Sequence, residues 1–377
     1  MMKQQLKTTA DVSPVSAVIL AAGFSSRMKD FKPLLPVGGT TMVEAVIHLF
    51  KANQITDIIV VTGHNSGLLE PCVKNAGARP VFNPDYASGM LTSIQKGIKN
   101  IRPNHSGFFL LPVDIPAIRP STIYRMIQAF QTTADHVIMP YFDATPGHPP
   151  LIPYRFKKDI LELKNGATLR DVLLSPETPV MRLKVCDRGV VMDADDKKGY
   201  KQVCRKLRAQ KIPDKEECLA IINEMLPGET HIRKHLADVS FAALKITHAL
   251  TDKLNTDLVI AAAMLHDIKR KEKHHAAAGA RLIQDIGFSE VSEIIAQHMD
   301  IHVDPTTPVK EKEIVYFADK ICNGHGVDLN YHKRFVECII KSPWARTNIS
   351  RRYENTRLIQ ARIEASAQKP IEEILSC

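Results

Sequence analysis

Two stretches of the chain combine residue types that bind phosphate and metal ions. The first is AAGFSSRM at residues 21–28, which directly follows the apolar run VSAVIL. Gly23 lets the backbone approach an anion closely, and the N–H groups of such a turn form an anion-binding nest to which serine hydroxyls add donors. Arg27 offers a forked cation suited to phosphate oxygens, and Lys32 follows five residues later. This pattern is neither Walker A nor GxGxxG, yet it predicts a nucleotide-binding loop.

Carboxylates that could hold Mg²⁺ follow two later runs. Asp114 lies in LPVDIP, where an apolar run ends, and Asp193 and Asp195 lie in VVMDADD after another β-like run. A nucleoside triphosphate is bound with Mg²⁺, which takes one or two carboxylates and completes its shell with phosphate oxygens. We therefore expect Asp114, with Asp193 or Asp195, to form a magnesium site, and we expect Asp196 to cap a helix.

The second stretch gathers histidine and aspartate on apolar helical segments. The pair His266 and Asp267 ends LVIAAAMLHD, His235 lies upstream in a helical pattern, and Asp319 lies downstream in EIVYFADKI. Four such N and O ligands suit Mn²⁺, Fe²⁺, Zn²⁺ or Mg²⁺. A second ion could take His275 and His298, and two ions bridged by one aspartate would form a phosphohydrolase centre.

The elements that must position these residues change character along the chain. From Val15 to Lys206, β-rich runs alternate with helical patterns, which predicts a mainly parallel sheet with crossover helices and ligands at the carboxyl ends of its strands. From Asp214 onward the apolar spacing is helical almost throughout. We expect an α/β domain over 14–206, an all-α domain over 214–345 and a charged helical tail over 346–377.

Composition narrows the class of protein. The chain has 377 residues, net charge +9 and seven dispersed cysteines without a CxxC pair, which favours two domains and reduced thiols in the cytoplasm. The longest apolar runs are too short to span a bilayer. Basic stripes with interleaved aromatic residues are missing from the sequence, so we expect neither nucleic acid nor membrane as a partner.

The first region resembles the molybdenum cofactor cytidylyltransferases, a branch of the MobA-like nucleotidyltransferases. The matching stretches are AAGFSSRM, KPLLP, NPDYASGMLTSIQKGI, LPVDIP and PGHPPLI, in this order within residues 15–200. One departure is Lys29, where the family usually has glycine. The resemblance implies a Rossmann-like fold and transfer of CMP from CTP to the phosphate of molybdopterin, which releases pyrophosphate. It also names a molybdenum hydroxylase apoenzyme as a further candidate partner.

The resemblance also assigns residues to roles. The implied nucleotide contacts are Ala21, Ala22, Gly23, Ser25, Arg27, Lys32, Asn83 and Ser93; the implied catalytic residues are Arg27, Lys32 and Asp114; and His148 of PGHP would face the acceptor.

The second region resembles the HD superfamily of metal-dependent phosphohydrolases over residues 214–325. The order H…HD…D, with HHxxxG and ADK in place, carries this resemblance. His235 fits better than His231 because valine follows it four residues later, whereas His274, His302, His325 and His332 are expected to be solvated or structural. The resemblance implies a divalent metal in this domain.

Several alternatives stay open. The first domain could use GTP or another NTP, or an acceptor such as a sugar or alditol phosphate. It could instead be a binding module that delivers cofactor with little turnover. In a further reading, the HD region is the main activity and the first domain serves as a nucleotide sensor.

Overall fold

The chain folds into two compact units that divide between Ala209 and Gln210. The computed structural model describes residues 14–25, 28, 30–164 and 166–376. Within these ranges, every helix is too short or too polar to cross a membrane. Each unit is built around its own core, and each contains one of the two groups of residues singled out above.

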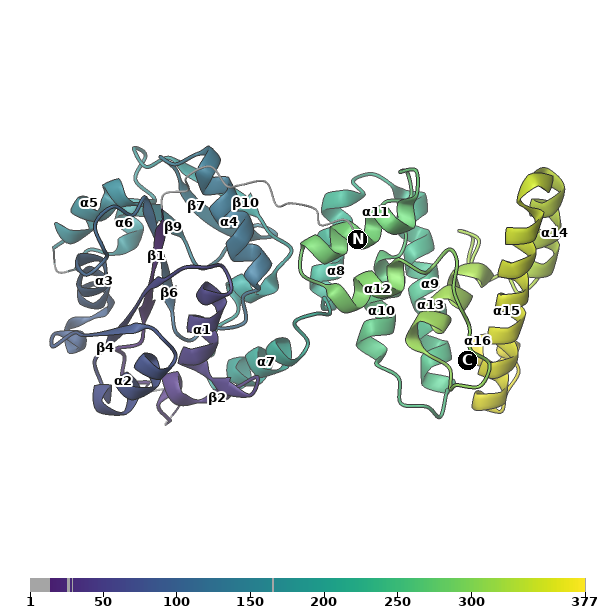
Figure 1. Ribbon diagram of the computed structural model, residues 1–377, viewed down its shortest axis with the longest axis horizontal. Coiled ribbons are helices and arrows are strands. Elements are labelled where there is room, and N and C mark those ends of the chain that lie inside the picture. The colour runs from purple at the N-terminus through teal and green to yellow at the C-terminus, as the bar shows by residue number, and fades with distance from the viewer. Residues whose placement is uncertain (1–13, 26–27, 29, 165, 377) are drawn as a thin grey trace, which may run out of the picture. The chain divides into compact units, whose positions relative to one another are not determined.

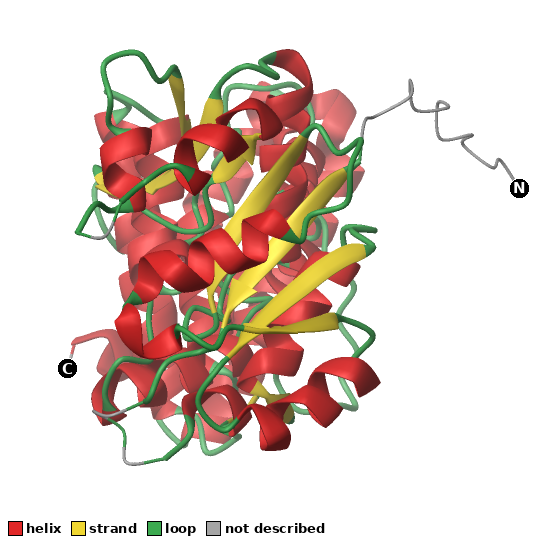
Figure 2. Ribbon diagram, turned by 90° about the vertical axis from the view of Figure 1, so that its left-hand side faces the viewer, coloured by secondary structure: helices red, strands yellow, loops and turns green. Residues whose placement is uncertain are grey.

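A twisted, mainly parallel sheet forms the centre of the first unit (Figure 2). Its strand order is β10-β7-β9-β6-β1-β4-β5, with β8 paired to β7. Among the described strands of this sheet, only β8 and β9 run antiparallel to their neighbours. The strands are β1 (Val15–Leu20), β4 (Asp57–Thr62), β5 (Arg79–Phe82), β6 (Gly107–Pro112), β7 (Val137–Phe142), β8 (Thr145–Pro146), β9 (Leu151–Pro153) and β10 (Val180–Lys184). A small hairpin of β2 (Pro36–Val37) and β3 (Thr40–Thr41) stands apart from this sheet.

Helices cover both faces of the sheet (Figure 1). One face packs against α3 (Met90–Lys99), α5 (Lys157–Leu161) and α6 (Leu169–Leu173), the other against α1 (Met42–Lys51) and α4 (Pro120–Thr132). Alternate side chains of β1 and β6 point to opposite faces, so both faces of these strands are apolar and buried. The predicted α/β class is therefore confirmed. The remaining helices of this unit are α2 (Ser66–Asn75) and α7 (Lys197–Arg208), and Asp196 caps α7 as predicted.

One sequence-based expectation is wrong. The run before Asp193 is not a strand but the 3₁₀ helix η4 (Arg188–Val191). Gly189 packs so tightly against Ala117 that a Cβ on it would lie 2.2 Å from the Ala117 carbonyl oxygen. The Asp187 side chain accepts a hydrogen bond from the Gly189 N–H and caps this turn. Close packing and a local cap therefore override the β-rich composition.

The second unit is all helical. Its helices are α8 (Lys215–Met225), α9 (Thr230–Ala249), α10 (Thr256–Leu265), α11 (His275–Asp285), α12 (Ser289–Ile295), α13 (Glu311–Ile321), α14 (Tyr331–Lys341), α15 (Arg346–Ala367) and α16 (Ile371–Ser376). Helices α9, α10 and α13 pack against one another at its centre. Polar side chains start two of these helices: Asp214 forms a capping box at α8, and Asn255 accepts from the Leu258 N–H at α10.

The last two helices belong to this second unit rather than to a separate tail. Ile359 and Ile363 of α15 are fully buried, and α15 packs on α13 while α16 packs on α9. Arg362 donates to Glu313 of α13 at 2.9 Å, and Lys245 of α9 donates to the Leu375 carbonyl at 3.0 Å. The C-terminal helices are therefore part of the same core.

Candidate nucleotide and metal sites

The predicted nucleotide-binding loop leaves the sheet at the carboxyl end of β1. The parallel register pairs Leu20 of β1 with Pro112 of β6, so the loops that follow these two strands lie side by side. The Ala21 N–H donates to Val61 and the Val113 N–H donates to Leu20, both at 3.0 Å. A cavity of about 480 Å³ opens above these loops. The backbone pairing of β1, β4 and β6 therefore fixes the floor of this cavity.

Residues of the predicted loop line this cavity. Ala21, Ala22, Gly23 and Ser25 all border it. The Ser25 hydroxyl accepts from the Lys32 N–H at 3.0 Å and closes the loop. A Cβ on Gly23 would meet no described atom within 4 Å, so this position leaves space for a ligand. Arg27 and Lys29 lie outside the described residues.

Lys32 joins the two groups of acidic residues. Its ammonium lies 3.1 Å from Asp114 Oδ2 and 2.8 Å from Asp195 Oδ1. Partial burial alone would lower the pKa of Lys32, but bonds to Asp195 and Asp114 raise it overall, so the side chain stays cationic. Asp193 lines the same cavity and its carboxylate accepts from the Asp195 N–H at 3.2 Å. Tertiary structure thus brings Lys32, Asp114, Asp193 and Asp195 to one cavity wall.

Two residues of the NPDYASGMLTS stretch have different positions. Ser93 borders the cavity, whereas Asn83 is 2% exposed and is not among the residues that line it. The Asn83 amide donates to Thr92 and Ser93 at 3.0 Å, and its oxygen accepts from the Asp85 N–H at 3.1 Å. Asn83 therefore positions Ser93 and the turn before α3 from beneath the cavity.

His148 lines a second cavity that adjoins the first. This cavity, of about 450 Å³, shares Leu20, Gly89, Met90 and Pro112 with the first. Most of its other lining residues are apolar or small. Burial lowers the pKa of His148, although the negative charges of Asp114 and Asp193 act in the opposite direction. The imidazole is therefore neutral at neutral pH.

The second unit gathers its histidines and aspartates into one cluster. His235 of α9, His266 and Asp267 at the end of α10, and Asp319 of α13 place donor atoms within 4.8 Å of one another. His235 Nε2 lies 3.1 Å from Asp319 Oδ1, and His266 Nε2 lies 3.5 Å from oxygens of both Asp267 and Asp319. Donors that share one ion at about 2.1 Å lie roughly 3.0–3.4 Å apart. These spacings therefore fit a shared divalent ion.

A second group of donors shares Asp267. Oδ1 of Asp267 lies 3.3 Å from His275 Nε2 and 3.4 Å from His298 Nε2, whereas its Oδ2 faces His235 and His266. The two oxygens of one carboxylate thus belong to two donor sets. This is the arrangement needed for two ions bridged by one aspartate.

Backbone carbonyls orient two of the imidazoles. His266 Nδ1 donates to the Ala263 carbonyl at 2.9 Å, and His298 Nδ1 donates to the Ile295 carbonyl at 2.7 Å. A proton held on Nδ1 leaves Nε2 with a free lone pair, as a metal ligand requires. Both Nε2 atoms point into the cluster, so each ring is fixed in the tautomer that binds a metal.

Buried polar atoms in this cluster fit a metal ion. His266 Nε2 and Asp267 Oδ1 are buried without a hydrogen-bond partner, a costly state that an ion would relieve. Burial alone would lower the pKa of His266, but the neighbouring carboxylates of Asp267 and Asp319 raise it to about 10, so a bound ion would displace the proton from Nε2. The pKa of Asp319 lies well below its usual range despite burial, because Lys320 and His235 stabilise its charge. The cluster therefore keeps its carboxylates ionised and attracts a cation.

Comparisons with known proteins match both units. Residues 17–180 match the family described as the MobA-like NTP transferase domain, and residues 232–324 match the HD domain. The chain carries a MobA-like NTP transferase domain followed by an HD domain. It is thus a nucleotidyltransferase of the MobA-like type, as the motifs predicted.

Individual relatives each cover about half of this chain or less. The molybdenum cofactor cytidylyltransferase of Escherichia coli (strain K12) is 29% identical over 186 residues, which cover 49% of this chain and 92% of the relative. The molybdenum cofactor guanylyltransferase of Sinorhizobium fredii is 28% identical over 130 residues, or 34% of this chain and 58% of the relative. A solved nucleotidyl transferase from Methanothermobacter is 21% identical, with a TM-score of 0.46, over 52% of this chain and 97% of that one.

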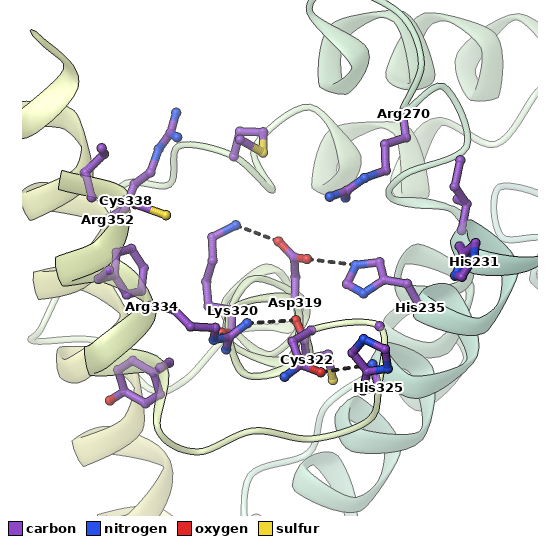
Figure 3. Close-up of a pocket in the computed structure, with 17 residues that line it drawn as sticks. His231, His235, Arg270, Asp319, Lys320, Cys322, His325, Arg334, Cys338 and Arg352 are labelled. Carbon is purple, nitrogen blue, oxygen red and sulfur yellow. Dashed lines mark hydrogen bonds and ion pairs between the residues drawn. The ribbon is translucent and has the colours of Figure 1, made fainter. Parts of the chain in front are cut away.

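The HD domain has a cavity that sequence reasoning missed. It measures about 610 Å³, and His235 and Asp319 form part of its wall (Figure 3). His231, one helical turn before His235, lines it too, and so does His325. Residues from α14 and α15 complete the wall, although the sequence indicated no chemistry there. The amphipathic pattern of α14 could have indicated a packed helix, but not that one side borders the metal cluster.

Proposed function

We propose that the transferase domain transfers CMP from CTP to the terminal phosphate of molybdopterin. The observation that carries this proposal is the cation between two carboxylates: Lys32 contacts Asp114 and Asp195 on the wall of the loop-lined cavity. The adjoining apolar cavity, lined by His148, is open to an acceptor with a ring system. The cytidylyltransferase relative, aligned over 92% of its length, favours CTP and this acceptor.

In the proposed reaction, a phosphate oxygen of the acceptor attacks the α-phosphorus of CTP. A P–O bond forms to the acceptor, and the bond from the α-phosphorus to the bridging oxygen breaks with release of pyrophosphate. The loop at residues 21–25 holds the phosphates, Lys32 and Arg27 offset their charge, and in-line positioning supplies most of the catalysis. Asp114, with Asp193 or Asp195, would hold Mg²⁺, which supplies further charge neutralisation when bound.

Pyrophosphate release from CTP and from GTP, each with and without molybdopterin, tests this proposal. We expect release with CTP only when molybdopterin is present. Equal release from both nucleotides, or none with molybdopterin, would refute the cytidylyl assignment. Release with GTP alone would instead favour the guanylyl alternative, which the second relative supports at similar identity.

We further propose that the HD domain is a metal-dependent phosphohydrolase. The two donor sets that share Asp267 carry this proposal. The candidate metals are Mn²⁺, Fe²⁺, Zn²⁺ and Mg²⁺, whose shared chemistry is to lower the pKa of a bound water and polarise a phosphoryl oxygen. His235 and Asp319 present this centre to the cavity. Phosphate release from phosphate esters, with Mn²⁺ or Fe²⁺ supplied, tests the proposal, and no release with any metal would refute it.

A further inference from the structure

The large cavity of the HD domain has two chemically different walls (Figure 3). One wall comes from α9 and α13 and includes His235 and Asp319 of the metal cluster. The opposite wall comes from α14 and α15 and includes Tyr331, Phe335 and Ile349. Helices α14 and α15 lie beyond residues 232–324, which match the HD domain. A ligand in this cavity would therefore touch the metal centre at one end and a surface outside the family match at the other.

The metal-facing end carries two cations held by cluster carboxylates. Arg270 donates to Asp267, and Lys320 donates to Asp319 at 2.6 Å and to the His298 carbonyl at 3.2 Å. Both side chains line the cavity. A divalent ion bound to Asp267 and Asp319 would replace Arg270 and Lys320 as the partner of these carboxylates. The two side chains would then be able to donate hydrogen bonds to the oxygens of an anion. This end of the cavity is therefore suited to a phosphate group.

The opposite wall carries aromatic rings as well as Arg334 and Arg352, and contacts between its side chains hold it together. The rings of Tyr331 and Phe335 have centroids 6.3 Å apart, and Tyr353 of α15 lies 5.4 Å from Phe335. The Tyr331 hydroxyl donates to Gln360 of α15 at 2.5 Å. These contacts fix α14 on α15, while Phe335 stays partly exposed on the cavity side. Aromatic surfaces of this kind favour flat rings through offset stacking or edge-to-face contact.

The loop between α13 and α14 holds this wall in place. Arg334 of α14 donates to the carbonyls of Lys320 and Cys322 and lies 3.3 Å from the Asp328 carboxylate. The guanidinium thus ties α14 to the residue that follows Asp319. Arg352 of α15 is likewise engaged, because it forms two bonds with Asp300. The distance between the aromatic wall and the metal ligands is therefore set by hydrogen bonds and an ion pair.

We propose that the HD domain binds a phosphate monoester whose alcohol part carries a flat ring, with the phosphate at the metal cluster and the ring against Phe335 of α14. That the anion is a phosphate rests on the proposed phosphohydrolase function. That the ligand carries a flat ring rests only on the side chains of α14 and α15. These helices are thus the specificity-determining part of the site.

Titration calorimetry of the full chain with Mn²⁺ tests this inference with two probes, phenyl phosphate and glycerol phosphate. Neither probe is a nucleotide, so neither imitates CTP, and loss of the preference in Phe335→Ala assigns the binding to the HD domain rather than to the acceptor cavity of the transferase domain. We expect phenyl phosphate to bind about tenfold more tightly, and Phe335→Ala to remove most of this preference. Phe335→Leu keeps an apolar side chain and guards against misfolding, and it too should lose the preference. Ile340→Ala, on the same helix but 70% exposed and outside the cavity wall, is the matched control.

Equal binding of both probes by the wild-type protein would overturn the inference, as would an unchanged preference in both Phe335 variants. Phosphate release from the same probes is measured in parallel. Selective binding without release would reject the proposed hydrolase but keep the ring-binding wall. Release from both probes without any preference would reject the wall and keep the hydrolase.

Discussion

The transferase and HD domains collect their acidic residues in different ways. In the HD domain, helices α9, α10 and α13 bring His235, His266, Asp267 and Asp319 together, and the last three side chains are 0%, 1% and 11% exposed. In the transferase domain, Asp114, Asp193 and Asp195 come from loops, and a lysine lies between Asp114 and Asp195. Among the described residues, only the HD domain offers donor sets close enough to hold an ion by themselves.

This difference teaches how each site would acquire its metal. The donor atoms of the HD cluster are assembled without substrate, because packed helices fix their positions and backbone carbonyls orient the imidazoles of His266 and His298. The transferase carboxylates need phosphate oxygens to complete a shell, as is usual for Mg²⁺. We therefore expect a resident ion in the HD domain and a substrate-borne ion in the transferase domain. The following predictions test this contrast, from the largest expected effect to the smallest.

Removal of one HD ligand should remove the resident metal. We expect the dialysed wild-type protein to retain a divalent ion without nucleotide, and His266→Ala to weaken that binding on the order of 100-fold or more, because loss of an outer-shell partner alone already costs 10–100-fold. Metal content measured by mass spectrometry checks this. Asp114→Asn is the control and should retain the metal. Retention by His266→Ala, or loss in Asp114→Asn, would contradict the contrast.

Loss of the bridging lysine should slow the transferase without affecting metal content. We expect Lys32→Met to reduce pyrophosphate release on the order of 10²–10³-fold, because a positioned cation that offsets phosphate charge is lost. The assay is pyrophosphate release with CTP and molybdopterin. Lys74→Met, at a largely exposed lysine outside the cavity wall, should retain the wild-type rate. A Lys32→Met enzyme with the wild-type rate would remove Lys32 from the proposed site.

The stability of the transferase domain should depend on the close packing of α3 against β1 and β4. A Cβ on Gly97 of α3 would lie 2.4 Å from Val18 and 2.9 Å from Val61, so Gly97→Ala should destabilise the transferase domain by about 1–3 kcal/mol. Urea unfolding followed by circular dichroism measures this. Gly67→Ala has open space around it and is the control; equal stability of both variants would contradict the prediction.

Asp57 is a buried carboxylate at the amino end of β4, away from the nucleotide site, and it should affect stability only. Asp57 accepts from Ser16 at 2.7 Å and pairs with Arg79 at 3.2 Å. Burial alone would raise the pKa of Asp57, but these bonds and the Arg102 N–H lower it overall. Its contribution to stability is therefore present above the unfolded value of about 3.9 and is lost as the pH falls through the lower folded pKa.

Asp57→Asn should accordingly destabilise the protein by about 1 kcal/mol near pH 6. The difference from wild type should shrink in urea unfolding curves below about pH 4. Pyrophosphate release by the folded variant should match wild type. A difference that keeps its full size down to pH 3 would show that the carboxylate charge is not the cause.

Much of both sites could be predicted from motifs because local rules place their residues. An apolar strand followed by AAGFSSRM puts the loop at the carboxyl end of a buried strand, and LPVDIP does the same for Asp114. The order H…HD…D on apolar helices likewise predicted four residues whose donor atoms the structure brings together. The resemblance implied that Asn83 contacts the nucleotide, but its buried side chain holds Ser93 in place. A sequence motif does not indicate which way a side chain points.

The sequence by itself determined the two kinds of domain, their order and the residue types at each site, because periodicity and short motifs depend on neighbours along the chain. Only the tertiary structure decided what depends on distant contacts. It placed Lys32 between Asp114 and Asp195, which are 82 and 163 residues further along the chain. It divided the two oxygens of Asp267 between two donor sets, and it folded α14 and α15 into the cavity wall opposite His235 and Asp319. Long-range packing sets these distances, and no local pattern contains them.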